Sequence, residues 1–346
     1  MLTPALATFI ERMPKVELHL HLEGAVAPRT FLALSRRNGI ALPVRTEQEL
    51  ADLFHYHDFH AFLGTFMALA ATIVRGEDFE LLAFELGMEL AAQHVIYAEV
   101  MISPMQHVRR GIDLREALAG AAAGFARAAQ HGGPRVGLVL DYGRQYGAAA
   151  AWPILETAIA CRSLGVVGWS IGGNEIDHPP EEFIELFAAA RAAGLGVMAH
   201  AGEVVGPASV WGAIDVLEVS RVGHGIRSID DPELLATLAA RRIVLDVCPS
   251  SNIRTKAATS WRDHPLRQLY DAGVPVTINS DDPTFFETTI TEEFRRAARY
   301  LGFTATDFCA MTRTAAQAAF LPPAERMALL ATIEQTHRHL RMELGV

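Results

Sequence analysis

Two histidines near the start of the chain are the residues whose types and spacing most suggest chemistry. His19 and His21 lie in the segment Lys15-Val-Glu-Leu-His-Leu-His-Leu-Glu-Gly24, where apolar and polar residues alternate. A period of two is typical of a strand with two unlike faces, so both imidazoles should project from one face. Two imidazoles side by side suit a divalent metal, most often zinc. Two ordinary buried histidines would give the same pattern, so the metal hypothesis needs further ligands.

Further candidate ligands follow at the ends of later strand-like runs. They occur in the segments His200-Ala-Gly-Glu203, Gly223-His224-Gly225 and Asn279-Ser-Asp281-Asp282-Pro283. Three imidazoles and one carboxylate would bind one Zn²⁺ per chain and leave a position for water; these ligands are His19, His21, His200 and Asp281. Zinc lowers the pKa of a bound water towards neutrality, which favours a hydrolytic reaction.

Two residues beside these ligands could transfer protons. His224, between two glycines, is the candidate acceptor for a proton of the attacking water, alone or together with Asp281. Glu203 follows His200 by three residues, which places it near a bound substrate as an acid or hydrogen-bond donor. A carboxyl group donates only when protonated, so this role requires a shielded site that raises its pKa.

Eight strand-like runs, separated by helical stretches, would position these residues. The runs are Lys15–Gly24, Val95–Ile102, Arg135–Leu140, Gly165–Trp169, Gly194–Ala199, Arg221–Gly223, Ile243–Val247 and Val274–Ile278. Their alternation with helices predicts a parallel (β/α)8 TIM barrel, in which functional residues lie at the carboxyl ends of the strands. An open, doubly wound sheet is the alternative. Because the sequence shows no low-complexity segment or linker, we expect residues 1–346 to form a single domain.

Two regions exceed the regular repeat and predict additional helices. Residues 25–94 contain an aromatic-rich helical segment, Phe54–Phe62, and a helix through Phe66 and Leu69, which we expect to lie over the barrel mouth. We expect the histidines of this first segment to be ordinary, partly exposed residues; they are His55, His57 and His60. Residues 304–346 predict a helical tail.

Individual residues mark where several helices start. Asp231, followed by Pro232, is typical of a helix N-cap. The helical tail should begin at Thr304 or Thr306, and the Pro322-Pro323 pair should precede its last helix. His264, next to a proline, is interpreted as a residue at a helix start.

Composition argues against several classes of protein. The 346 residues carry a formal net charge of -10 and no basic arm, which disfavours a nucleic-acid partner. No apolar run reaches the length of a membrane span, and Met1–Arg12 predicts a short amphipathic helix, not a signal peptide. The three cysteines are far apart, and Cys248 has no base placed to make it a nucleophile. We therefore expect a cytoplasmic protein that binds a small molecule.

Five motifs, in this order, resemble those of the adenosine and adenine deaminases of the amidohydrolase superfamily. They are Pro14–Gly24, His200–Glu203, Gly223–Gly225, Cys248-Pro-Ser-Ser-Asn252 and Asn279–Pro283. The resemblance implies zinc-dependent hydrolytic deamination of a 6-aminopurine nucleoside. Adenosine or 2'-deoxyadenosine would give inosine or 2'-deoxyinosine and ammonia.

The resemblance also implies roles for individual residues. Glu203 would protonate purine N1, and His224 would orient and deprotonate the attacking water. Four residues would contact the substrate: His21, Glu23, Gly173 and Asp282. Asp282 would form a hydrogen bond with purine N7, and the Gly173 amide would donate one to N3. Zinc would be bound by the four ligands already named.

Several residues depart from the family pattern near the expected sugar side of the pocket. Ser170 and Asn174 replace two aspartates, Met101 replaces a frequent arginine, and Glu23 stands where animal-type enzymes have an aspartate that meets the ribose. Free adenine and 6-aminodeoxyfutalosine are therefore alternative substrates. Arg254 is a candidate partner for the carboxylate of 6-aminodeoxyfutalosine, and the alternative interpretation, an ordinary surface arginine, is the one that the sequence favours. A non-catalytic purine-binding protein is the alternative from another class.

Overall fold

Eight parallel strands form the centre of the molecule in a computed structural model that describes residues 2–56 and 59–346. Each strand pairs with the next in sequence order. The strands are β1 (Lys15–His21), β2 (Val95–Ile102), β3 (Arg135–Gly143), β4 (Val166–Gly172), β5 (Gly196–Ala201), β6 (Arg221–His224), β7 (Val244–Val247) and β8 (Val276–Ile278). This nearly closed barrel confirms the predicted TIM-barrel fold and excludes the open, doubly wound alternative.

The first and last strands meet through a short seam. The His21 amide donates to the Asp281 carbonyl at 2.8 Å, and the Asp281 amide donates to the His19 carbonyl at 3.1 Å. The side-chain oxygen of Asn279 also accepts bonds from the amides of Leu18 and His19. Because β8 is short, these bonds to the segment that follows it complete the barrel beside the two histidines.

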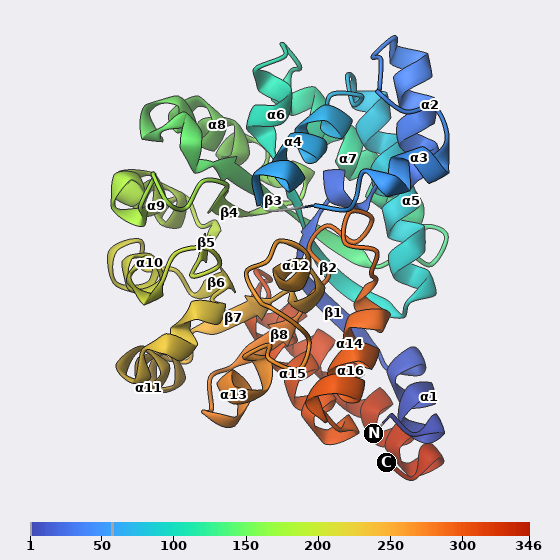
Figure 1. Cartoon of the computed structure of the whole chain (residues 1–346), viewed down its shortest axis with the longest axis vertical. Coiled ribbons are helices and arrows are strands. Elements are labelled where there is room, and N and C mark those ends of the chain that lie inside the picture. The colour runs from blue at the N-terminus through green and yellow to red at the C-terminus, as the bar shows by residue number, and fades with distance from the viewer. Residues whose placement is uncertain (1, 57–58) are drawn as a thin grey trace.

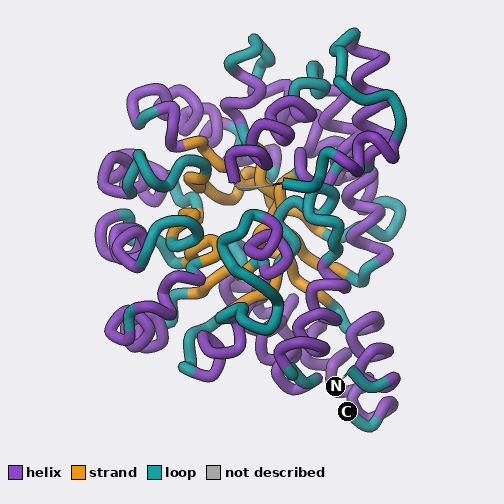
Figure 2. The backbone as a smooth tube through the Cα atoms, viewed as in Figure 1, coloured by secondary structure: helices purple, strands orange, loops and turns teal. Residues whose placement is uncertain are grey.

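Helices surround the strands, as Figures 1 and 2 show. They are α1 (Pro4–Arg12), α2 (Pro28–Asn38), α3 (Glu47–Asp52), α4 (Phe59–Ala70), α5 (Gly76–Ala92), α6 (Pro104–Val108), α7 (Leu114–Ala129), α8 (Ala148–Ala160), α9 (Ile184–Ala192), α10 (Pro207–Trp211), α11 (Pro232–Arg241), α12 (Pro249–Arg254), α13 (Leu266–Asp271), α14 (Ile290–Leu301), α15 (Ala305–Ala318) and α16 (Pro323–Leu344). Across the part of the chain that the structure describes, none of these helices combines the length and apolar character needed to span a membrane.

Most predicted helix starts are confirmed. The Asp231 side chain accepts bonds from the amides of Glu233 and Leu234 at the start of α11. Thr304, and not Thr306, caps α15, and α16 begins at Pro323. The predicted N-terminal helix is α1, which lies near the C-terminal helix α16 (Figure 1).

The prediction of a helix over Phe54–Phe62 is wrong at its start. Helix α4 begins at Phe59 and continues to Ala70, so it also includes the helix predicted through Phe66. Phe54, His55 and Tyr56 are not helical, and the Phe54 carbonyl accepts a bond from Arg254. His55 is exposed, as expected; His57 lies outside the described residues, as does the side chain of His60.

The fifth strand also differs from its predicted range. It spans Gly196–Ala201 instead of Gly194–Ala199, so His200 lies within the strand and not after it. Gly194 adopts a φ of 78°, which ends the preceding helix and delays the strand. His200 is thereby held by the paired backbone of the barrel.

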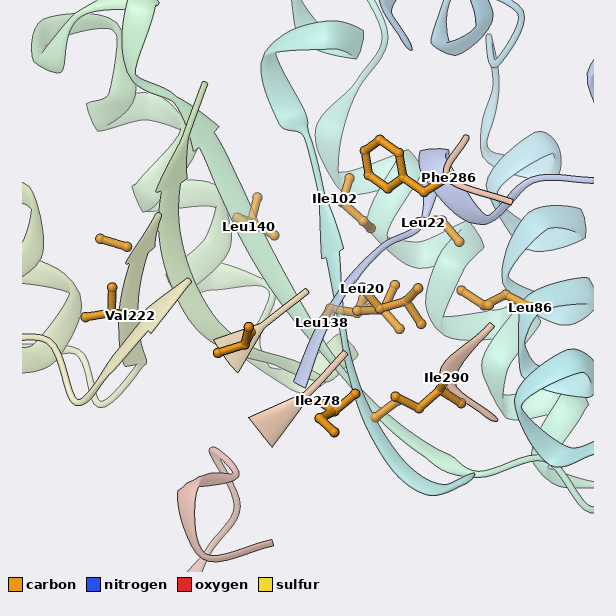
Figure 3. Close-up of a cluster of buried hydrophobic side chains, with 14 of the residues drawn as sticks. Leu20, Leu22, Leu86, Ile102, Leu138, Leu140, Val222, Ile278, Phe286 and Ile290 are labelled. Carbon is orange, nitrogen blue, oxygen red and sulfur yellow. The ribbon is translucent and has the colours of Figure 1, made fainter. Parts of the chain in front are cut away.

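Apolar side chains fill the layer between the strands and the helices. Figure 3 shows Leu20 of β1, Leu86 of α5 and Ile290 of α14 in this layer. Each is at most 5% exposed. This packing orients β1 so that His19 and His21, which alternate with the leucines, project towards the barrel interior.

A fully buried cluster of charged side chains lies inside the barrel. Arg221 contacts Glu99 at 2.6 Å and Asp246 at 2.9 Å, and all three side chains have no exposed area. Arg221 begins β6, whereas His224 ends it. The charged cluster is therefore nearer the amino ends of the strands, and the histidines lie at the carboxyl ends.

We expect Arg221→Leu to lower the free energy of unfolding by about 3–5 kcal/mol, because it leaves two buried carboxylates without their partner. Urea unfolding followed by circular dichroism measures this change. The control is Arg135→Leu, which removes an exposed pair with Glu325 and should change stability little. Equal unfolding midpoints for Arg221→Leu and the parent protein would contradict the stabilising role of the cluster.

Candidate active site

The four predicted metal ligands converge at the carboxyl end of the barrel. The ring centroids of His19 and His21 are 5.5 Å apart, and those of His19 and His200 are 4.6 Å apart. One potential ligand atom from each of these histidines lies within 4.8 Å of those of the other two. The Oδ1 atom of Asp281 is 3.4 Å from the Nε2 atoms of both His19 and His21.

The environment of His19 fits a metal ion. Its side chain is fully buried, and among the described residues neither ring nitrogen has a hydrogen-bond partner. Buried polar atoms are normally paired, so these nitrogens point to a ligand. Burial lowers the pKa of His19 to about 3, which leaves the ring neutral with a lone pair. Burial would raise the pKa of Asp281, but the adjacent His19, whose Nε2 atom is 3.4 Å from Oδ1, lowers it below its ordinary value.

Cys248 also lies close to this cluster. Its thiol is within 4.8 Å of potential ligand atoms of His19 and Asp281. Burial raises the pKa of the thiol well above its ordinary value, and the thiol donates to the Asp246 carbonyl at 3.7 Å. These observations favour the three histidines and Asp281 as the ligand set, and agree with the expectation that Cys248 is not a nucleophile.

Unusual backbone conformations hold the site. His224 and Asp281 have φ values of 62° and 65°, in the left-handed region that residues other than glycine seldom adopt. Gly223 permits close packing, since a Cβ atom there would lie 2.8 Å from Cε1 of His19. These strained backbone conformations place the side chains of His224 and Asp281 beside the other site residues.

The predicted proton-transfer residues lie beside the metal ligands. The His224 Nε2 atom is 3.7 Å from Glu203 Oε2 and 3.8 Å from Asp281 Oδ2. Burial raises the pKa of Glu203 to about 7, so a large fraction of this carboxyl is protonated at neutral pH. Glu203 can thus act as a hydrogen-bond donor, as its predicted role requires.

One pocket joins most of the predicted site residues. Its walls include His21, Gly173, His200, Glu203, His224, Asp281 and Asp282. Burial and the neighbouring Asp281 raise the pKa of Asp282 well above its ordinary value, so Asp282 can also donate a hydrogen bond. An apolar wall completes the pocket with Phe62, Leu63, Phe66 and Phe286.

Glu23 lies behind the wall of this pocket. It is only 1% exposed, and one carboxylate oxygen accepts a bond from the Ser103 amide and lies 2.7 Å from His107 Nε2. Ser103 itself lines the pocket. The other oxygen of Glu23 has no partner within the described chain. Glu23 is therefore fixed by protein contacts before any substrate binds.

Arg254 forms its contacts outside the pocket. It donates to the Phe54 carbonyl at 2.5 Å and contacts Glu287 at 2.8 Å. It is absent from the described residues that line the pocket. These contacts tie α12 to the segment before α4.

Sequence reasoning missed several residues that shape the site. Asp141 lines the pocket, and its Oδ1 atom is 3.4 Å from Nδ1 of His200. Arg144 donates to the His200 carbonyl, and Glu175 accepts bonds from the amides of Gly202 and Val204. The position of Asp141 near the end of a barrel strand was the available signal, because the other site residues occupy such positions.

Residues 14–336 match the adenosine deaminase family. The chain belongs to the adenosine/adenine deaminase family. This member of the family is therefore an aminohydrolase of the amidohydrolase superfamily.

Two relatives and one solved structure illustrate the similarity of this deaminase to other members. It is 36% identical to an adenine deaminase of Cupriavidus necator, over 95% of this chain and 94% of that protein. It is 37% identical to an aminodeoxyfutalosine deaminase of Streptomyces avermitilis, over 95% and 92%. An amidohydrolase structure from Burkholderia ambifaria with bound Zn is 31% identical, with a TM-score of 0.90 over 100% of this chain and 96% of that one.

We expect Gly223→Ala to weaken zinc binding by roughly 10–100-fold, because its Cβ atom would displace His19. Metal content after dialysis against a series of chelator concentrations measures this effect. Gly206→Ala is the matched control, since a Cβ atom at Gly206 meets no other atom within 4 Å. Zinc retention identical to that of the parent would show that Gly223 does not control the position of His19.

Proposed function

We propose that this protein is a zinc-dependent aminohydrolase that converts free adenine to the corresponding 6-oxopurine and ammonia. One observation carries the proposal. Two carboxyl groups with raised pKa values, Glu203 and Asp282, share a pocket with the histidine cluster. Two protonated carboxyls match two ring nitrogens of a purine, which accept hydrogen bonds on either side of C6.

The residues of the chain have distinct roles in the proposed reaction. His19, His21, His200 and Asp281 would hold the zinc ion. When bound, zinc lowers the pKa of a coordinated water molecule.

The expected substrate contacts come from residues of this pocket. Glu203 donates a proton to purine N1, which makes C6 more electrophilic. Asp282 donates a hydrogen bond to N7, and the Gly173 amide donates one to N3. His224 and Asp281 flank the attacking water, which adds to C6 before ammonia leaves. Phe62, Phe66 and Phe286 would limit the access of other water.

The surroundings of the pocket support a free base as substrate. Glu23, which the sequence placed against a sugar, is held by His107 and Ser103. The described pocket lining contains no lysine or arginine, so it offers little to a negatively charged substituent. The Cupriavidus necator relative is named an adenine deaminase. The sequence motifs favoured adenosine, whereas these observations favour adenine.

A second candidate substrate is 6-aminodeoxyfutalosine. The Streptomyces avermitilis relative is named for this substrate. Arg254 is engaged by Phe54 and Glu287, but the Arg109 guanidinium lies 4.8 Å from the ring centroid of Tyr146, which lines the pocket. Arg109 is therefore a better placed partner for a substrate carboxylate than Arg254.

A substrate comparison tests the proposal. We expect kcat/KM for adenine to exceed that for adenosine and 2'-deoxyadenosine by at least about 100-fold, because Glu23, the expected sugar contact, is already held by Ser103 and His107. Ammonia release by the zinc-loaded protein measures each rate. A highest kcat/KM for 6-aminodeoxyfutalosine would support the second candidate instead. No turnover of any of these compounds would contradict purine deamination.

We expect Glu203→Gln to retain zinc and to lower kcat/KM for the best substrate by about 100–10,000-fold, because an amide cannot protonate N1. Metal analysis and initial rates are measured on the same preparation. Glu185→Gln, at an exposed position, is the control and should behave as the parent. A Glu203→Gln variant with near-normal turnover would exclude the proton-donor role.

A further inference from the structure

A chain of three buried side chains leads from His224 away from the pocket. The Asn252 Nδ2 atom is 3.1 Å from Nδ1 of His224, and its Oδ1 atom is 3.2 Å from Nε2 of His264. The Leu266 amide donates to Nδ1 of His264 at 3.2 Å. His224, Asn252 and His264 are at most 2% exposed. We call these three residues the Asn252 relay.

The amide at the end of the Asn252 relay determines the direction of every hydrogen bond in it. A backbone N–H can only donate, so Nδ1 of His264 accepts and the ring is neutral. Its single hydrogen is then on Nε2, which donates to Oδ1 of Asn252. The burial that lowers the pKa of His264 to about 3 agrees with a neutral ring. A reversed Asn252 amide would place two donors against each other.

The direction of the hydrogen bond between Asn252 and His224 follows from the same rule. Asn252 presents its NH₂ group to His224, so Nδ1 of His224 is the acceptor. The hydrogen of a neutral His224 ring is then on Nε2. That nitrogen faces Glu203 and Asp281, at 3.7 and 3.8 Å. A protonated Nε2 atom has no lone pair with which to accept a proton from water.

We infer that His264, acting through Asn252, is a positioning residue that fixes the Nε2–H form of His224, so that His224 donates a hydrogen bond to the attacking water and Asp281 accepts the water proton. The inference deepens the proposed function and rests on it. It replaces the sequence-based expectation that His224 removes this proton.

The two oxygens of Asp281 suit this division of roles. Oδ1 lies 3.4 Å from the Nε2 atoms of His19 and His21, whereas Oδ2 is the oxygen nearest to Nε2 of His224. In the proposed step an O–H bond of water breaks, its proton passes to the Asp281 carboxylate, and the oxygen bonds to C6. Glu203 supplies the proton that N1 gains. As the C6–N bond breaks, the amine leaves as ammonia with the proton from Asp281, and the remaining hydroxyl proton returns to the Glu203 carboxylate.

Nitrogen NMR of the zinc-loaded protein, labelled with ¹⁵N in its histidines, tests the inference directly. We expect the two ring nitrogens of His224 to show an Nε2–H, Nδ1-acceptor signature. His264→Gln should preserve this signature, because its side-chain amide can still donate to Asn252. An Nδ1–H signature for His224 in the parent protein would overturn the inference without the need for any variant.

Asn252→Asp is the isosteric variant that should reverse the relay. Its carboxylate accepts from both histidines, so the hydrogen of His224 moves to Nδ1. We expect kcat to fall by at least about 100-fold with zinc content unchanged, and the unfolding midpoint to fall because the new carboxylate is buried. A reversed signature with parental kcat would show that the His224 tautomer does not matter.

Failure of the proposed function would be distinguishable from failure of this inference. If no purine were deaminated, the proposed function would be wrong. The NMR signature of His224 in the parent protein does not depend on a substrate, so it would still support or overturn the assigned direction of the Asn252 relay.

Discussion

The hydrogen bonds between β1 and the segment after β8 are the interactions on which the site depends. The Asp281 backbone bonds to His19 and His21 on both sides, and this places the Asp281 carboxylate beside both imidazoles. Asn279 adds two bonds to the backbone of β1, and Ser280 donates twice to Glu17. Residues more than 250 positions apart in the chain thus become neighbours through the closure of the barrel. The left-handed φ of Asp281 is tolerated because these bonds hold it on either side.

The sequence predicted the features that depend on local periodicity. Alternation around His19 and His21 indicated a strand, and repeated strand and helix patterns indicated the barrel, so the set of residues at its carboxyl end followed. The range of β5 and the non-helical conformation of Phe54 were less predictable, because Gly194 adopts a left-handed φ and the Phe54 carbonyl accepts a bond from Arg254. The latter contact joins segments 200 positions apart, which no local pattern reveals.

Side-chain partners were the hardest features to predict. Glu23 follows the pattern of a pocket residue, yet His107, from a helix after β2, fixes its carboxylate. His264 does lie at a helix start, as its sequence indicated, but the same ring also bonds to Asn252. In both cases the residue type was informative, and its partner depended on how distant loops pack. The roles proposed for such residues therefore rest on geometry and not on motifs.

Burial and neighbouring groups explain why the carboxyl groups of the pocket differ in pKa. Burial alone would raise the pKa values of Glu203, Asp281 and Asp282, since charged groups lose hydration. Only Asp281 lies against His19 and His21, and its pKa is lowered. An ionised Asp281 in turn makes ionisation of Asp282 less favourable. The anionic Asp281 carboxylate thus helps to keep Asp282 protonated. The same type of side chain therefore provides a metal ligand in Asp281 and hydrogen-bond donors in Asp282 and Glu203.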